Sequence, residues 1–204
     1  MTEELFLRNV PGSRERMSGA VIGIAGCGGL GSNAAVSLIR AGVDRLILAD
    51  HDRVEISNLN RQAFFHSDVG AFKSVVLAEH LRGINPEAEV ISHVETVTKR
   101  NMSELFSEAD ILIEAFDRAE QKQWLINTWS KTFPDRPIVS GNGIAGIGRT
   151  GMLRVTKIGN IYFCGDMTSE MEEGLCAPRV AIVANMQAHV VVELLVKGSI
   201  DGNG

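Results

Sequence analysis

Three glycines in the pattern Gly26-x-Gly28-x-x-Gly31 are the first residues whose spacing points to chemistry. Glycine at these positions allows a tight turn and a close approach of the backbone to a phosphate. The amide groups and the positive end of a helix dipole then face the negative charge. Glycine-rich turns also serve plain packing between a strand and a helix. The pattern therefore predicts a nucleotide site only where a strand precedes it and a helix follows it.

An acidic residue, Asp50, follows Gly31 by 19 positions and ends an apolar run. A carboxylate in this place accepts hydrogen bonds from ribose hydroxyls in nucleotide-binding folds. The alternative is a solvated acid at the end of a strand. Up to this point, an NAD-dependent oxidoreductase and an ATP-using enzyme are equally supported.

A polar loop after this acid separates the two possibilities. Residues 50–62 read DHDRVEISNLNRQ, and this loop is expected to bring an arginine and two side-chain amides back toward the glycine loop. A dinucleotide site does not need so many polar side chains at this position. Arg61 can hold phosphate oxygens through its planar fork, and Lys73 can add a point charge near the start of the next helix. Each cation, taken alone, also fits a solvated surface position. Their combination favours ATP.

A second acid, Asp117, ends the segment Glu114-Ala115-Phe116-Asp117 and is expected at the carboxyl edge of the sheet, beside the same crevice. A carboxylate there can hold Mg²⁺ that bridges triphosphate oxygens. Asp117 can also be the N-cap of the helix that follows, and the two roles are compatible.

The elements that must position these residues alternate along the chain. Apolar, β-branched runs predict strands, and apolar residues at helical spacing predict helices. The alternation predicts an α/β fold with a doubly wound, Rossmann-like sheet, parallel in the N-terminal part and mixed toward the C-terminus. The expected strands cover residues 20–25, 45–50, 89–94, 110–115, 137–140, 152–156 and 161–164, and the expected helices cover residues 33–40, 69–83, 119–132 and 180–196, with a short helix after residue 101.

The length of 204 residues and the composition, 45% hydrophobic and 22% charged, are typical of one globular domain. We expect residues 1–204 to form a single domain, with residues 1–18 as a loosely held arm and residues 197–204 as a loosely held tail. Residues 180–196 are apolar on nearly every side, which predicts two packing partners for this helix. One of them could be a second subunit.

The charge and the cysteines exclude several classes of partner. A net charge of −5 offers no general attraction to nucleic acid or to an anionic membrane. The longest uncharged stretch, residues 19–39, contains six glycines and is a poor membrane helix. Three cysteines without a CxxC motif cannot supply a four-thiolate zinc site, and they fit a reducing compartment. Since the N-terminus lacks the order of a secretory signal, we expect a cytoplasmic protein without zinc, nucleic acid or membrane.

Five motifs occur in an order that resembles the ThiF/MoeB family, the bacterial relatives of ubiquitin-activating enzymes. They are GCGGLGS, DHDRVEISNLNRQ, Lys73, Asn85-Pro86 and EAFD, and the resemblance covers residues 8–196. The compact length and the segments FLRNVPGS, DRAEQK and GLCAPRVAIVANMQAH look most like the short, zinc-free branch of ThiF that is assigned to thiamine biosynthesis.

The resemblance implies an ATP-dependent adenylyltransferase. Its substrates would be ATP and the C-terminal glycine of a small ubiquitin-like sulfur carrier protein with a Gly-Gly tail, and its products an acyl-adenylate and pyrophosphate. A tail carboxylate is already a nucleophile at neutral pH. The reaction therefore needs no Ser-His-Asp triad and no activated cysteine, and none is visible in the sequence.

The site residues of the family correspond to positions of this chain. The resemblance implies that Asn58, Arg61 and Lys73 contact phosphates and that Asp117 holds Mg²⁺, with Arg61, Lys73 and Asp117 as catalytic residues. The other residues implied to bind ATP are Gly26, Gly28, Gly29, Leu30, Gly31, Asp50, Asp52 and Gln62.

The family also uses an arginine from the N-terminal segment, which reaches into the active site of the other subunit of a homodimer. Arg8 is the best candidate for this catalytic residue, and Arg14 is the second. Longer members have a cysteine that joins the activated carrier through sulfur. Cys176 lies in the corresponding region but follows three glutamates of residues 170–173, and nearby acids disfavour the thiolate. We expect Cys176 to have no chemical role.

Two other functions stay open. A family relative could activate a carboxylate on another substrate, such as a modified tRNA adenosine, but the acidic balance argues against tRNA. A regulatory module could bind a nucleotide without chemistry. Such a module would not be expected to keep Arg61, Lys73 and Asp117 together.

Overall fold

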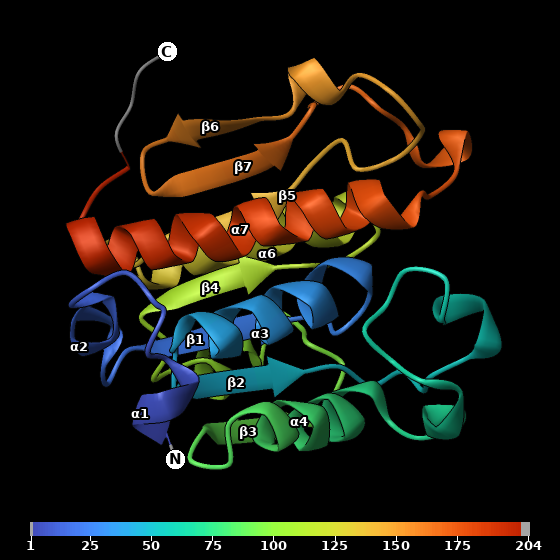
Figure 1. Cartoon of the computed structure of the whole chain (residues 1–204). Coiled ribbons are helices and arrows are strands. Elements are labelled where there is room, and N and C mark those ends of the chain that lie inside the picture. Colours follow the sequence, from blue (N-terminus) through green and yellow to red (C-terminus); the bar gives the residue numbers. More distant parts are fainter. Residues whose placement is uncertain (1, 201–204) are drawn as a thin grey trace.

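The computed structural model describes residues 2–200 as an α/β fold built on one seven-stranded sheet (Figure 1). The strands are β1 Val21–Ala25, β2 Arg45–Ala49, β3 Glu89–His93, β4 Ile111–Glu114, β5 Ile138–Gly141, β6 Arg154–Ile158 and β7 Ile161–Gly165. The helices are α1 Thr2–Leu5, α2 Ser13–Met17, α3 Gly29–Ala41, α4 Lys73–Ile84, α5 Met102–Leu105, α6 Ala119–Thr132 and α7 Ala177–Lys197.

The sheet has the strand order β3-β2-β1-β4-β5-β7-β6. Neighbouring strands from β3 to β7 run parallel, and β6 runs antiparallel to β7. The predicted doubly wound sheet, parallel first and mixed toward the C-terminus, is confirmed. Every residue of β1, β4 and β5 is buried. These strands are nearly continuous apolar runs because helices cover both of their faces.

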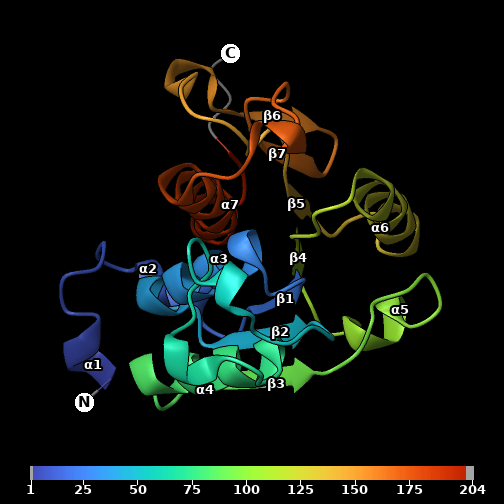
Figure 2. The ribbon, with the colours of Figure 1, turned by 90° about the vertical axis from the view of Figure 1, so that its right-hand side faces the viewer.

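Two helical layers enclose the sheet. Figure 2 shows α3, α4 and α7 on one face and α5 and α6 on the other. Each layer has its own buried core, one that includes Leu38, Leu77 and Val191, and a second that includes Phe106 and Trp129. Because both faces are covered, a ligand site is expected beyond the carboxyl ends of the strands.

Two helices begin at different residues from those expected. α3 begins at Gly29, inside the glycine loop, rather than at residue 33. α4 begins at Lys73 rather than at residue 69, because an isolated β-bridge joins Arg53 to Phe72 and the Lys73 amide donates a hydrogen bond to the Asp52 carbonyl, at 2.9 Å. Both differences place a residue of the predicted ATP site in the first turn of a helix.

The apolar helix α7 finds its packing partners within the chain. It lies against α3 on one side and against β5 and β7 on another, and α2 contacts it as well. Ile182, Asn185 and His189 remain exposed along it. Among the described residues, α7 is also the one helix long and apolar enough to cross a membrane, but its buried face is that of a core helix. The apolar sequence of α7 therefore does not by itself require a second subunit.

The N-terminal segment packs on the end of the domain that lies away from the strand carboxyl ends (Figure 1). Phe6 and Met17 are buried, and the Asn9 side-chain amide donates a hydrogen bond to the carbonyl of Ala41, the last residue of α3, at 2.8 Å. Arg16 binds the Val196 carbonyl near the end of α7, at 3.0 Å. Residues 1–18 were expected to be loosely held, but within the described residues 2–18 these contacts attach the segment to two helix ends. Residue 1 lies outside the described residues. Of the expected loose tail, residues 201–204 lie outside the described residues.

Candidate functional site

A cavity of about 500 Å³ opens at the carboxyl ends of the central strands. It lies where the chain order of the sheet reverses, between β1 and β4, which is the usual ligand position in doubly wound sheets. Ten residues expected to bind ATP line it, together with the expected Mg²⁺ ligand Asp117. The ten are Gly26, Gly28, Gly29, Leu30, Asp50, Asp52, Asn58, Arg61, Gln62 and Lys73. Gly31 and Arg8 are not part of the lining.

Sequence analysis did not identify several other lining residues. They are Ala49, His51, Glu55, Glu95, Thr96, Val97, Ala115, Phe116, Arg118, Gln121, Ile144, Met171, Leu175 and Val180. Residues 95–97 follow β3, so the rule that ligands bind beyond strand carboxyl ends could have identified them. Ile144 follows β5 by three residues, so the same rule applies to it. Met171 and Leu175 lie on a long loop and Val180 lies in the first turn of α7, and these three residues have no such local signal.

The glycine loop explains why α3 can begin at the cavity. Gly26 has a φ of +96°, and a Cβ at Gly31 would lie 1.8 Å from the Gly26 carbonyl oxygen. A Cβ at Gly28 would meet only the Gln62 side-chain nitrogen, at 3.8 Å. The N-cap of α3 is Gly28, and no side chain caps the helix. The first-turn amides of α3 are therefore available to an anion in the cavity.

Asp50 ties the glycine loop to the end of β2. Its Oδ2 accepts a hydrogen bond from the Cys27 amide at 2.6 Å, and its Oδ1 accepts one from the Asp52 amide at 2.7 Å. Burial raises the pKa of Asp50, and these two hydrogen bonds and the Lys73 charge partly oppose the increase. Asp50 thus has a structural role in the loop, and its contact with a ribose stays a prediction.

The polar loop returns to the glycine loop as expected. Asn58 organises it, because its Oδ1 accepts the Glu55 amide at 3.1 Å and its carbonyl accepts the amides of Arg61 and Gln62. The Asn33 side chain in the first turn of α3 donates to the Arg61 carbonyl at 2.9 Å. These contacts hold Arg61 and Gln62 beside the glycines. The Gln62 Oε1 is buried and has no hydrogen-bond partner among the described residues, so it is free to accept from a ligand.

Three cations line the cavity, Lys73, Arg61 and the exposed Arg118, and the first two differ in how firmly they are held. Lys73 is only 6% exposed, and its Nζ lies 2.9 Å from Asp52 Oδ2. Arg61 is half-buried, and its Nη1 donates to the Ser57 carbonyl at 3.1 Å and to Asn60 Oδ1 at 2.9 Å. Together they supply positive charge on the side of the cavity that the polar loop forms.

Asp117 presents a free carboxylate to the same cavity. Within residues 2–200 it forms no hydrogen bond or ion pair, and the N-cap of α6 is Arg118 without a capping side chain. The alternative N-cap role of Asp117 is therefore wrong in this structure. The fully buried Glu114 supports the turn, since it accepts the Phe116 amide at 2.7 Å, Lys122 Nζ at 2.9 Å and Ser140 Oγ at 2.6 Å.

The donor set is compatible with a magnesium nucleotide. Asp117 is an unpartnered carboxylate in a cavity that also contains three cations and available amides. Mg²⁺ in such sites binds one or two carboxylates together with phosphate oxygens. Side-chain ligand atoms of Asp50, His51 and Asp52 also lie within 4.8 Å of one another. Asp52 is already paired with Lys73, which makes Asp117 the better available ligand.

The three cysteines are free thiols, and none lines the cavity. Burial raises the pKa of Cys27 well above its usual value, with Asp50 adding to the increase, and burial raises the pKa of Cys164 to about 12. Cys176 is half-buried at the N-cap of α7. Both buried thiols are therefore poor nucleophiles.

Arg8 is far from the cavity of its own chain. It is exposed in the segment that packs against the last residue of α3, whereas the cavity lies at the first residues of this helix. The 13 residues of α3 correspond to about 20 Å. The second candidate, Arg14, lies in the same segment, with its guanidinium 4.9 Å from the Phe6 ring centre. Neither arginine can reach this cavity without a large movement.

The sequence matches the ThiF family over residues 5–202, and the chain belongs to this family. The sulfur carrier protein ThiS adenylyltransferase of Bacillus subtilis is 36% identical over 123 residues, which cover 59% of this chain and 37% of that protein. The adenylyltransferase and sulfurtransferase UBA4 of Lodderomyces elongisporus is 28% identical over 192 residues, which cover 90% of this chain and 42% of that protein. The chain spans about two fifths of the length of these relatives.

Among solved structures, the chain is similar to the tRNA N6-threonylcarbamoyladenosine dehydratase TcdA of E. coli in complex with ATP. The TM-score is 0.82 at 24% identity, over 94% of this chain and 92% of that chain. At this level of identity the similarity shows a shared fold.

The close contact in the glycine loop can be tested by stability. We expect Gly31→Ala to lower the free energy of unfolding by about 3 kcal/mol or more, because the new methyl group overlaps the Gly26 carbonyl. Gly83→Ala is the matched control, since Gly83 lies in α4 with nothing within 4 Å of its Cβ position. It should be neutral or stabilising by up to about 1 kcal/mol. Equal urea midpoints for the two variants would contradict the described loop geometry.

Proposed function

We propose that this chain uses ATP to adenylate the C-terminal glycine carboxylate of a small ubiquitin-like sulfur carrier protein of the ThiS kind, releasing pyrophosphate, in thiamine biosynthesis. The observation that supports it best is one cavity that combines available helix amides, the cations Arg61 and Lys73 and the unpartnered carboxylate of Asp117. Membership of the ThiF family and the name of the Bacillus subtilis relative support the choice of substrate.

The proposed reaction needs charge neutralisation more than proton transfer. A carboxylate oxygen of the carrier attacks the α-phosphorus of ATP, a new O–P bond forms, and the bond between the α- and β-phosphates breaks. The amides of the glycine loop, Arg61 and Lys73 stabilise the negative charge that moves onto the departing pyrophosphate. Mg²⁺, when bound, would shield phosphate charge, and Asp117 would hold it.

A second candidate is the activation of a carboxylate on another substrate, such as a modified tRNA adenosine. The fold similarity to TcdA favours it, and the net charge of −5 disfavours tRNA as a partner. ATP–pyrophosphate exchange, measured with and without a carrier that ends in Gly-Gly, separates the candidates. Exchange that depends on the carrier supports our proposal. ATP–pyrophosphate exchange that responds only to modified tRNA would contradict our proposal and support the second candidate.

Loss of either Arg61 or Lys73 should strongly lower the turnover of the enzyme. We expect Arg61→Ala and Lys73→Ala each to lower turnover by about 10²–10³, the range for the loss of one preorganised electrostatic contact. Arg154→Ala, which removes an exposed cation from β6, is the control and should change turnover by less than about twofold. Pyrophosphate exchange within threefold of wild type in both cavity variants would show that these residues do not act on the phosphates.

Adenylation should not depend on thiols. We expect Cys176→Ala, and the replacement of all three cysteines by alanine, to leave carrier adenylation within about threefold of wild type, which is less than about 1 kcal/mol in the barrier. The products should be followed by mass spectrometry of the carrier. If Cys176→Ala preserved exchange but abolished formation of a carrier thiocarboxylate, the adenylation proposal would stand and Cys176 would have a role in sulfur transfer.

We also propose that the protein is a cytoplasmic homodimer in which Arg8 of one subunit serves the cavity of the other. Arg8 lies at the end of its own subunit that is opposite to the cavity, and this position supports the proposal. Sedimentation at micromolar concentration should give a dimer, and Arg8→Ala should lower turnover without changing the urea midpoint. A stable, active monomer would exclude the exchange of Arg8 between subunits.

A further inference from the structure

Two loops form an apolar wall of the cavity, and both follow neighbouring parallel strands. The loop of residues 142–153 follows β5, and the loop of residues 166–176 follows β7. The first contributes Ile144 to the cavity, and the second contributes Met171 and Leu175. No regular secondary structure other than short 3-10 turns holds these loops. Side-chain contacts and a few backbone hydrogen bonds therefore hold these loops at the cavity.

The centre of these contacts is Asp166, directly after β7 and completely buried. Its Oδ1 accepts the amides of Thr168 and Ser169, each at 2.8 Å, and its Oδ2 binds Arg179. Burial alone would raise the pKa of Asp166, but the hydrogen bonds from Ser169 and Thr168 and the Arg179 charge outweigh it and lower the pKa to about 2. The carboxylate therefore stays charged inside the protein.

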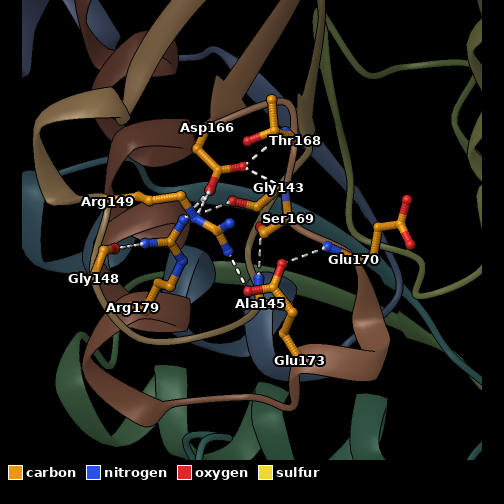
Figure 3. A network of polar contacts seen from close by, with 10 residues as sticks. All are labelled: Gly143, Ala145, Gly148, Arg149, Asp166, Thr168, Ser169, Glu170, Glu173 and Arg179. Atoms are coloured by element: carbon orange, nitrogen blue, oxygen red, sulfur yellow. Dashed lines mark hydrogen bonds and ion pairs between the residues drawn. The ribbon is translucent and has the colours of Figure 1, made fainter.

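Arg179 extends from this carboxylate to the other loop. It lies in the first turn of α7, is 6% exposed, and donates to the carbonyls of Gly148 and Gly143, the latter at 3.4 Å. Figure 3 shows that its guanidinium lies between Asp166 and the loop that contains these glycines. One side chain thus joins β7, α7 and the loop after β5.

A second arginine adds an outer connection. Arg149 lies 3.4 Å from Asp166 Oδ2 through its Nε and pairs with Glu173 through its Nη2 (Figure 3). The other oxygen of Glu173 accepts the Glu170 amide at 3.2 Å, which closes the turn that carries Met171.

Backbone contacts complete the connection between the loops. The Gly146 amide donates to the Gly174 carbonyl at 2.8 Å, and the Ala145 amide donates to Ser169 Oγ at 3.2 Å. Each apolar residue of the wall is adjacent in sequence to a residue of this network: Ile144 to Gly143 and Ala145, Leu175 to Gly174, and Met171 lies inside the turn closed by residues 170 and 173. A movement of the network would move the wall.

Stability alone is a poor reason for this arrangement. A buried ion pair adds little net stability over apolar side chains of the same size, because both charges lose their hydration. A cation in the first turn of a helix also opposes the helix dipole, and α7 is 21 residues long. The arrangement is more specific than stability requires, because the single guanidinium group of Arg179 contacts both loops.

We infer that the Asp166–Arg179 pair is a positioning device that holds the apolar wall of the cavity against bound nucleotide. This inference rests on the proposed use of ATP. The residues of the pair do not line the cavity, so they act through Ile144, Met171 and Leu175. Loss of the pair loosens both loops and weakens nucleotide binding, while the cations and amides that act on the phosphates stay in place.

The test is Arg179→Met, which keeps an unbranched apolar side chain and removes the guanidinium group. The dissociation constant for ATP, measured by calorimetry without a carrier, should rise at least tenfold. In carrier adenylation the KM for ATP should rise similarly, with kcat within about threefold. Amide hydrogen exchange should accelerate at residues 146, 168 and 169. Arg45→Met is the matched control, because Arg45 pairs with Glu89 at 2.9 Å at the amino ends of β2 and β3 and should leave the ATP affinity within twofold.

A folded Arg179→Met variant whose ATP affinity stays within threefold of wild type would overturn the inference. Unchanged rates of amide hydrogen exchange in both loops would overturn it as well. If this variant does not fold, Arg149→Met removes only the half-exposed outer arginine. It should weaken ATP binding at least threefold with faster exchange at residues 170–174, and unchanged affinity there would also overturn the inference. Since ATP binding is measured without a carrier, failure of the proposed adenylation is distinguishable from failure of this inference.

Discussion

The close contact between Gly31 and the Gly26 carbonyl is the constraint on which the site depends. Because no side chain separates the two backbones, α3 begins directly after β1 and directs its first amides to the cavity. Asn33, near the start of α3, holds the polar loop, and Asp50 at the end of β2 holds the glycine loop through the Cys27 amide. The ends of β1 and β2 and the start of α3 thus meet around the short contact between Gly31 and the Gly26 carbonyl.

Several buried polar side chains organise the rest of the cavity by pairing with a neighbour that they orient. Glu114 sets the turn that presents Asp117, and the side-chain amide of Gln187 in α7 binds the carbonyls of Glu114 and Val139. Asp166 and Arg179 do the same for the loops after β5 and β7. Glu114, Gln187 and the Asp166–Arg179 pair therefore position the walls, whereas Lys73, Arg61, Gln62 and Asp117 line the cavity itself.

Sequence analysis predicted most of the fold and much of the site, because both are encoded in short segments. Apolar runs and helical spacing predicted the order of strands and helices along the chain, and α6 begins and ends at the expected residues. The rule that ligands bind beyond the carboxyl ends of parallel strands, together with the family resemblance, gathered Asp50, Arg61, Lys73 and Asp117 correctly into one cavity. Sequence analysis did not identify residues 95–97 as cavity residues, although the same rule applies to residues that follow β3.

What the sequence by itself determined is therefore local: the glycine turn, the alternation of strands and helices, and the residues that immediately follow the strands. The tertiary structure alone decided that α7 packs on α3, β5 and β7, that the N-terminal segment attaches to the far end of α3, and that Arg179 meets Asp166. The physical reason is that periodicity and backbone conformation act over a few residues. Packing and buried charge pairing depend on which distant segments the fold brings together.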